Sequence, residues 1–181
     1  MKVFKFGGTS VGSIENMRSV MKIITDGEQK LVVLSAMSGT TNSLVEISDY
    51  LAKKNKESAL AVISALEKKY YNVVYDLYKS AEKKEQGKKV LEERFDVIKS
   101  FTSGIFNELG ERTLLAQGEL ISTALFTLMM QEEGYKTELL PALDFMKIDS
   151  DKMPDMRYIK TKINEVIASS PKADYYITQG F

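Results

Sequence analysis

The first fifty residues alternate apolar runs, polar loops and helical patterns, and this alternation restricts the fold more than any other feature of the chain. Residues 3–6 form a short apolar run that predicts a buried strand, and the run ends at Gly7-Gly8. A helical pattern covers residues 14–24, and residues 31–34 predict a second buried strand. A second helix is predicted to begin at Ser43. This repeated order predicts an α/β fold with a mainly parallel sheet.

The middle of the chain is predicted to be helical. Apolar residues at helical spacing cover 57–84 and 88–106, and the charged run between them predicts a solvated turn at Gly87. We interpret the region from about 55 to 106 as a helical insertion packed beside the sheet. The other predicted elements are a helix over 118–133, a strand over 135–140, a helix over 155–169 and a strand over 175–177.

Cysteine and histidine are both missing, and their absence excludes much of the usual chemistry. The chain has no cysteine, which excludes disulfides, a thiol nucleophile and thiolate metal sites. It has no histidine, which removes the usual general base and the commonest zinc ligand. Basic and acidic residues number 25 each, so no overall charge favours nucleic acid or a membrane as a partner. With no signal peptide and no apolar run of membrane-spanning length, we expect a cytoplasmic protein without a metal site of its own.

The stretch KFGGTS, residues 5–10, is the first candidate site. Gly7 and Gly8 let backbone N–H groups approach a ligand closely, and the helix that follows adds positive potential. Thr9 and Ser10 can donate further hydrogen bonds, and Lys5 supplies a positive charge for phosphate oxygens. A plain turn between strand and helix explains the glycines equally well. The stretch alone leaves these two interpretations open.

Two further stretches are ambiguous in the same way. The loop SAMSGTTN, residues 35–42, is rich in hydroxyl groups, which ordinary turns also favour. In a parallel sheet it would face the same cleft as Gly7-Gly8, because ligands bind at the carboxyl ends of the strands. Glu119 is predicted near the start of a helix. It is either a first-turn glutamate favoured by the helix dipole or a partner for a substrate's ammonium group.

In order along the chain, these motifs resemble those of the aspartate kinases, within the amino-acid kinase fold family. The resemblance rests on KFGGTS at residues 5–10, VLSA..G.TN at 33–42, GE..S at 118–122 and ITQGF at 177–181. It implies a three-layer α/β/α sandwich like that of carbamate kinase. It also implies transfer of the γ-phosphoryl group of ATP to the side-chain carboxylate of L-aspartate. The product, 4-phospho-L-aspartate, enters lysine, threonine and methionine synthesis.

The resemblance assigns roles to individual residues. The residues expected to hold the ATP phosphates, with Lys5 as the catalytic group, are Lys5, Phe6, Gly7, Gly8, Thr9 and Ser10. Those expected to contact aspartate are Ser35, Thr41, Glu119 and Phe181. Mg²⁺ is expected to arrive with the nucleotide. The chemistry suits a chain without histidine, because a carboxylate with a pKa of about 3.9 is already ionised at neutral pH and needs no base.

Known aspartate kinases are longer than this chain, and their nucleotide-binding and regulatory parts follow the ITQGF motif. We therefore expect an N-terminal part of the kinase domain without regulatory domains, with little activity alone, from a protein that is a homo-oligomer at full length. Three alternatives stay open. The chain could be another acid kinase or nucleotide-monophosphate kinase of this fold, or a non-catalytic small-molecule-binding module. It could also be the N-terminal part of a bifunctional aspartokinase–homoserine dehydrogenase.

Overall fold

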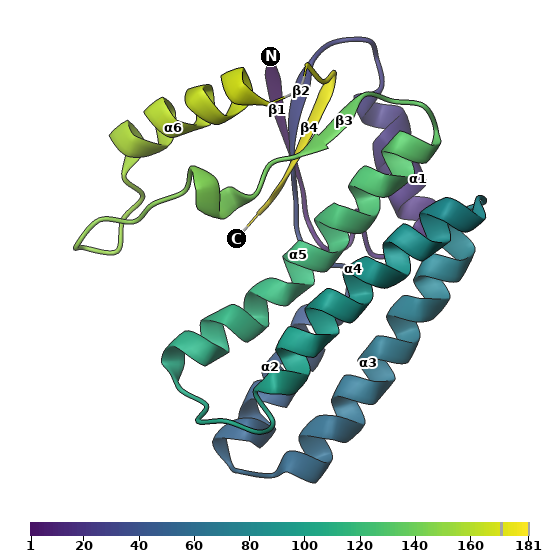
Figure 1. Cartoon of the computed structure of the whole chain (residues 1–181). Coiled ribbons are helices and arrows are strands. Elements are labelled where there is room, and N and C mark those ends of the chain that lie inside the picture. Colours follow the sequence, from purple (N-terminus) through teal and green to yellow (C-terminus); the bar gives the residue numbers. More distant parts are fainter. Residues whose placement is uncertain (171, 181) are drawn as a thin grey trace.

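The computed structural model describes residues 1–170 and 172–180, and it contains one parallel sheet (Figure 1). The strands are β1 (Lys2–Phe6), β2 (Lys30–Leu34), β3 (Thr137–Leu139) and β4 (Tyr175–Gln179). Their order across the sheet is β1-β2-β4-β3, and every neighbouring pair is parallel. The predicted α/β class and the mainly parallel sheet are therefore confirmed.

Strand β1 lies at one edge of the sheet, so the prediction that it is buried is wrong. Val3 is 63% exposed and Lys5 is also exposed, whereas Phe4 and Phe6 are half-buried against the main core. Side chains alternate between the two faces of a strand, and β1 has a neighbour on one side only. The second predicted strand, β2, is buried as expected because it has a neighbour on each side.

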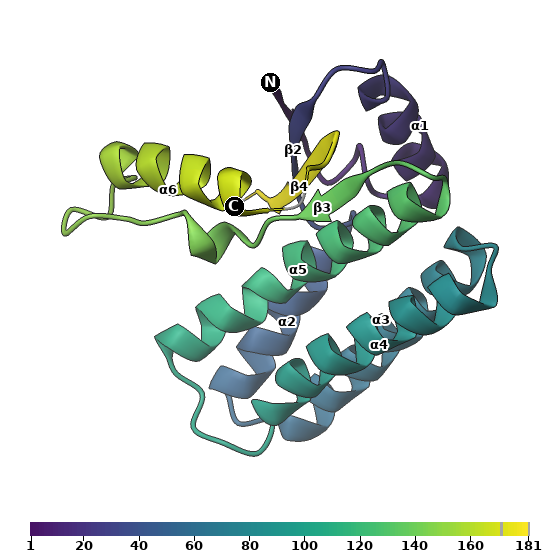
Figure 2. The same cartoon turned by 45° about the horizontal axis from the view of Figure 1, so that its top comes forward.

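Helices cover both faces of the sheet, which confirms the predicted three layers (Figures 1 and 2). On one face, α1 (Ile14–Ile24) and the second half of α5 (Glu108–Glu132) pack against apolar side chains of β2 and β4. On the other face lie α6 (Met156–Ser169) and the short 3₁₀ helix η1 (Ala142–Asp144). This second core is smaller and includes Leu31, Leu140, Phe145 and Tyr176.

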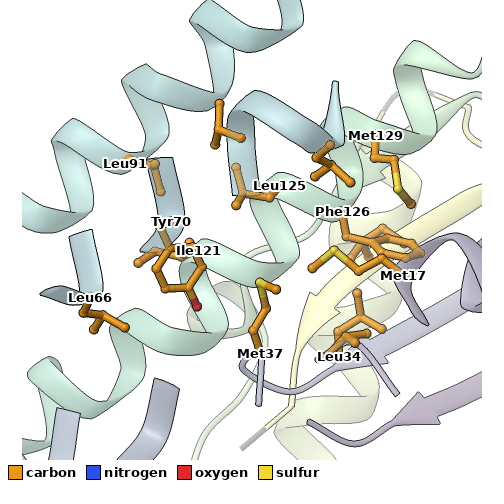
Figure 3. Close-up of a cluster of buried hydrophobic side chains, with 14 of the residues drawn as sticks. Met17, Leu34, Met37, Leu66, Tyr70, Leu91, Ile121, Leu125, Phe126 and Met129 are labelled. Carbon is orange, nitrogen blue, oxygen red and sulfur yellow. The ribbon is translucent and has the colours of Figure 1, made fainter. Parts of the chain in front are cut away.

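The predicted helical middle forms a bundle that extends away from the sheet (Figure 2). Helices α3 (Lys56–Leu77) and α4 (Ala81–Ser100) form a hairpin that packs on α2 (Thr40–Ala52) and the first half of α5. The core of the bundle is continuous with the core beneath the sheet, and Figure 3 shows Tyr70, Leu125, Phe126 and Leu34 within this one cluster. Helix α5 therefore connects the bundle to the sheet.

The predicted turn at Gly87 is wrong, because Gly87 lies inside α4. The turn lies at residues 78–80, where the Glu132 carboxylate accepts hydrogen bonds from the backbone N–H groups of Lys79 and Ser80 at 2.8–3.1 Å. Gly87 is buried, and a Cβ there would lie 2.7 Å from the Tyr78 ring. The glycine permits close packing of α4 on the residues that end α3.

Two helices begin earlier than predicted. Helix α2 begins at Thr40 rather than Ser43, after Gly39 in a left-handed conformation with φ of 80°. Helix α5 begins at Glu108, where the side chain of Asn107 accepts a hydrogen bond from the backbone N–H of Gly110 at 2.9 Å. By length and composition α5 could cross a membrane, but 61% of its most apolar window is buried inside this fold. It is the core helix of the protein.

Candidate active site

The two glycine-containing loops pack directly against each other at the carboxyl ends of β1 and β2. A Cβ at Gly8 would lie 3.0 Å from the carbonyl oxygen of Ala36, and a Cβ at Gly12 would lie 2.8 Å from the Cβ of Ser38. Such separations are shorter than ordinary carbon contacts, so only glycine allows the two loops to approach this closely. The two loops, expected to face one cleft, therefore lie next to each other at this end of the sheet.

The first loop exposes hydrogen-bond donors that the fold does not use. The backbone N–H groups of Gly7, Gly8 and Thr9 donate no hydrogen bond to any residue among 1–170 and 172–180. The Lys5 ammonium is also exposed and has no ion pair within those residues. Buried or half-buried backbone groups are normally paired, so a cluster of free donors beside a positive charge is suited to an anion.

Not all residues of the first motif point in one direction. Lys5 lies on the sheet face opposite Phe4 and Phe6, because successive side chains alternate along β1. Thr9 and Ser10 line a shallow pocket of about 290 Å³ beside α1, where the Asn16 amide donates to the Thr9 carbonyl at 2.7 Å. The Thr9 and Ser10 side chains therefore lie in a different pocket from Thr41 and Glu119, two of the residues expected to contact aspartate.

Glu119 lies in the middle of α5, so the interpretation of it as a first-turn glutamate is wrong. Its carboxylate accepts a long hydrogen bond, 3.4 Å, from the backbone N–H of Ala36 in the second loop. Partial burial raises the pKa of Glu119 above its ordinary value, and the hydrogen bonds from backbone groups only partly oppose this. A carboxylate held in this setting gains from a cationic partner, which would offset the cost of its partial desolvation.

The second loop is fastened to α5 at several points around Glu119. The Ser122 hydroxyl donates to the carbonyl oxygen of Ser35 at 2.8 Å. A Cβ at Gly118 would lie 2.9 Å from the Cβ of Ala36, so the helix and the loop are in close contact there. The structure thus brings Ser35 and Glu119 together, as the motifs predict.

Thr41 and Glu119 line one pocket of about 600 Å³ along the exposed side of α5. Most of its other lining is apolar, including Leu115, Leu120 and Leu143. Sequence reasoning missed Arg112, which also lines this pocket two helical turns before Glu119 and pairs with the Glu108 carboxylate. The seven-residue spacing of Arg112 and Glu119 on one helix is the signal that would have found it.

Gln179, at the end of β4, is a second residue that sequence reasoning missed. Its buried amide donates to the Thr123 hydroxyl at 2.8 Å and accepts from the Ala142 N–H at 2.7 Å. These bonds hold the end of β4 against α5 on one side and against η1 on the other. Phe181, predicted to contact the substrate, lies outside the described residues.

No group of three or more acidic side chains in residues 1–170 and 172–180 is placed to hold a metal ion. The groups that the structure brings together at this edge are a lysine, backbone amides, hydroxyl groups and the carboxylate of Glu119. This set can bind an anion and an ammonium group close to each other.

Comparison with known proteins identifies the family to which the chain belongs. A model of the amino acid kinase family matches residues 1–180. The chain is 30% identical to "Aspartokinase 2, chloroplastic" of Arabidopsis thaliana over 159 residues, which are 82% of this chain and 28% of that protein. It is 39% identical over 77 residues to a "Bifunctional aspartokinase/homoserine dehydrogenase, chloroplastic" of Daucus carota, which are 41% of this chain and 8% of that protein.

The fold has a close counterpart among solved structures. The crystal structure of E. coli aspartokinase III in complex with aspartate and ADP superposes with a TM-score of 0.79 and 24% sequence identity. The match covers 100% of this chain and 40% of that one, so the chain spans less than half the length of each protein compared. Because the family model covers nearly every residue, the chain belongs to the amino acid kinase family.

Proposed function

We propose that this chain is part of an aspartate kinase, which transfers the γ-phosphoryl group of ATP to the side-chain carboxylate of L-aspartate. One observation carries the proposal. Within residues 1–170 and 172–180, the free N–H groups of the first loop and the Lys5 ammonium, which has no ion pair, lie at the same end of the strands as a pocket that contains the Glu119 carboxylate. An anion and an amino acid have complementary partners there. The aspartokinase relatives and the aspartate and ADP bound in the E. coli protein support the same substrates.

The reaction needs charge neutralisation rather than proton transfer. An oxygen of the aspartate side chain attacks the γ-phosphorus, a new P–O bond forms, and the bond to the β-phosphate oxygen breaks to release ADP. The attacking carboxylate is ionised at neutral pH, because its reference pKa is about 3.9. Repulsion between two anions is then the main obstacle. Lys5 and the N–H groups of Gly7 and Gly8 would reduce it by binding phosphate oxygens.

Glu119, Thr41 and Ser35 would hold the amino acid. Glu119 would accept a hydrogen bond from the substrate's ammonium group, which gives its partly buried carboxylate a cationic partner that no residue in the described part of the chain supplies. The Thr41 hydroxyl lines the same pocket, and Ser35 is fixed beside it through Ser122. Mg²⁺ would come with the nucleotide.

The complete active unit is proposed to be longer than this chain. The chain covers 28% of the Arabidopsis relative and 40% of the E. coli structure. We therefore expect little turnover from these 181 residues alone and full activity from the complete protein, which we propose to be a cytoplasmic homo-oligomer. A second candidate is the kinase part of a bifunctional aspartokinase–homoserine dehydrogenase, which the Daucus carota relative favours.

The test compares the complete protein with the 181-residue chain. Each is incubated with MgATP and aspartate, glutamate or uridylate, and the acyl phosphate is trapped with hydroxylamine while ADP is measured. We expect ADP and hydroxamate in equal amounts with aspartate and the complete protein only. Equal activity with glutamate or uridylate, or none with any acceptor, would contradict the proposal. Reduction of aspartate semialdehyde with a nicotinamide cofactor would identify the bifunctional form.

A further inference from the structure

Tyr70 is a fully buried tyrosine whose hydroxyl is hydrogen-bonded to the Thr40 hydroxyl at 2.8 Å. Both residues are 0% exposed, so water does not replace this bond. The ring of Tyr70 packs edge-on against Phe95 and lies in the core cluster with Leu66, Leu91 and Ile121 (Figure 3). Phenylalanine would fill this apolar space equally well. The hydroxyl is therefore the feature that needs an explanation.

The hydroxyl remains protonated under all ordinary conditions. Burial raises the pKa of Tyr70 far above its usual value, the Thr40 hydrogen bond opposes this, and the negative charge of Glu119 adds to the increase. Tyr70 is thus a neutral hydrogen-bonding group and takes no part in proton transfer. Its effect on any chemistry has to be exerted through the position of Thr40.

Thr40 lies where three parts of the site meet. It is the first residue of α2, directly after the loop that contains Ser35 and directly before Thr41. Its methyl group would lie 3.3 Å from a Cβ at Gly118, so it also contacts α5 one residue before Glu119. A displacement of Thr40 therefore changes the separation of Thr41 and Glu119.

The same turn of α3 makes a second contact with this loop. The Lys69 ammonium donates to the carbonyl oxygen of Ser38 at 3.0 Å and lies 3.8 Å from the Cβ position of Gly39. Lys69 and Tyr70 thus hold the loop at Ser38 and Thr40, on both sides of the left-handed Gly39. The helical hairpin is joined to the candidate site at this point.

We propose that Tyr70 is a positioning residue, which holds Thr41 and Glu119 at the separation that an amino-acid substrate requires. The proposal rests on the function proposed above, because it assigns those two residues to the amino acid. It gives the hairpin of α3 and α4 a role in substrate binding although neither Tyr70 nor Lys69 lines the substrate pocket.

The test uses Tyr70→Phe in the complete protein with Tyr78→Phe as the matched control. Tyr78 is also buried, and it directly follows the last residue of α3. Its hydroxyl donates a hydrogen bond to the Leu125 carbonyl at 2.8 Å, and neither residue lines the substrate pocket. Each variant loses one buried hydroxyl, so both should unfold at a lower temperature than the wild type. In Tyr70→Phe alone, the KM for aspartate should rise about threefold to tenfold, equivalent to one lost hydrogen bond, while the KM for ATP stays unchanged.

Two further measurements separate positioning from packing. Amide hydrogen exchange across residues 35–42 should accelerate in Tyr70→Phe and not in Tyr78→Phe. Adding Thr40→Val to Tyr70→Phe removes the unpaired hydroxyl of Thr40 without restoring the bond, so the unfolding temperature should recover part of its loss while the KM for aspartate stays raised.

The outcomes distinguish this proposal from the one on which it rests. Equal effects of Tyr70→Phe and Tyr78→Phe on aspartate KM and loop exchange would overturn the positioning role and leave aspartate kinase activity in place. Faster loop exchange with an unchanged aspartate KM would overturn it as well. A wild-type protein that does not phosphorylate aspartate would overturn both.

Discussion

Replacing Gly118 by alanine tests whether the close contact between α5 and the second loop maintains the substrate pocket. A new Cβ would lie 2.9 Å from the Cβ of Ala36 and 3.3 Å from side-chain carbons of Leu44 and Thr40. Carbon atoms attract best at about 3.5–4.0 Å, so the first contact is strongly repulsive. The Cβ of Ala36 is attached directly to the backbone, and only a shift of the loop or the helix can relieve the clash.

Two opposing effects determine the change in stability. Alanine favours a helix interior over glycine by about 1 kcal/mol. Overpacking a core contact costs about 1–3 kcal/mol. Subtracting the helix-propensity gain from the overpacking cost predicts that Gly118→Ala lowers the free energy of unfolding by up to about 2 kcal/mol. The same shift lengthens the bond from the Ala36 N–H to Glu119, which is already 3.4 Å, so the KM for aspartate should rise.

Gly87→Ala is the matched control. It also replaces a buried helical glycine by alanine, and its Cβ would lie 2.7 Å from the Tyr78 ring and 3.0 Å from Val74. Thermal unfolding and aspartate kinetics are measured for both variants in the complete protein. Both should be destabilised, and only Gly118→Ala should change the aspartate KM. A Gly118→Ala protein that is more stable by about 1 kcal/mol, with unaltered kinetics, would show that helix propensity outweighs the contact.

Three further predictions concern charged groups. Lys5→Ala in the complete protein should lower kcat about 100-fold or more without lowering the unfolding temperature, and unchanged turnover would exclude phosphate binding by Lys5. As pH falls through the raised pKa of Glu119, that carboxylate loses its charge, so aspartate KM should rise before the substrate's own carboxylate, of pKa about 3.9, is protonated. Glu119→Gln should raise aspartate KM at neutral pH and abolish this dependence, which a pH series of initial rates would check. The ammonium of buried Lys30, and then the backbone N–H of Glu28, hold the pKa of Asp26 below its usual range. The Asp26–Lys30 ion pair therefore stabilises the fold at pH values above the ordinary carboxyl pKa. This stabilisation is lost as pH falls through the lowered pKa of Asp26. Asp26→Asn should thus reduce the unfolding temperature at pH 7 and approach the wild type in acid; a difference independent of pH would contradict the ion-pair explanation.

The periodic features of the sequence predicted the fold well. Strands β2 and β4 and helix α1 are found where apolar spacing places them, because burial of an apolar face requires that spacing. The two glycine loops were predicted to face the same cleft, and the contact of Gly8 with Ala36 shows that they lie next to each other. A parallel sheet brings the carboxyl ends of neighbouring strands together whatever the details of the loops.

The errors arise where contacts between distant residues override local signals. Gly87 resembles a turn residue, yet it lies within a helix because Tyr78 needs the space that a side chain would fill. The start of α2 depends on Thr40, whose buried hydroxyl needs a partner thirty residues later in the sequence. Helix α5 begins ten residues before its predicted start, so Glu119 belongs to the middle of a helix. No local pattern contains these long-range partners.

The length of α5 has a mechanical consequence for the carboxylate at its centre. The helix has 25 residues and is about 37 Å long, with one end against the sheet and the other in the bundle. Glu119 is one residue from its midpoint. The first half of the helix packs in the bundle and the second half against the sheet, so Glu119 lies where the two parts of one continuous core meet. A substitution on either side that tilts the helix would therefore be transmitted to this carboxylate through close-packed side chains.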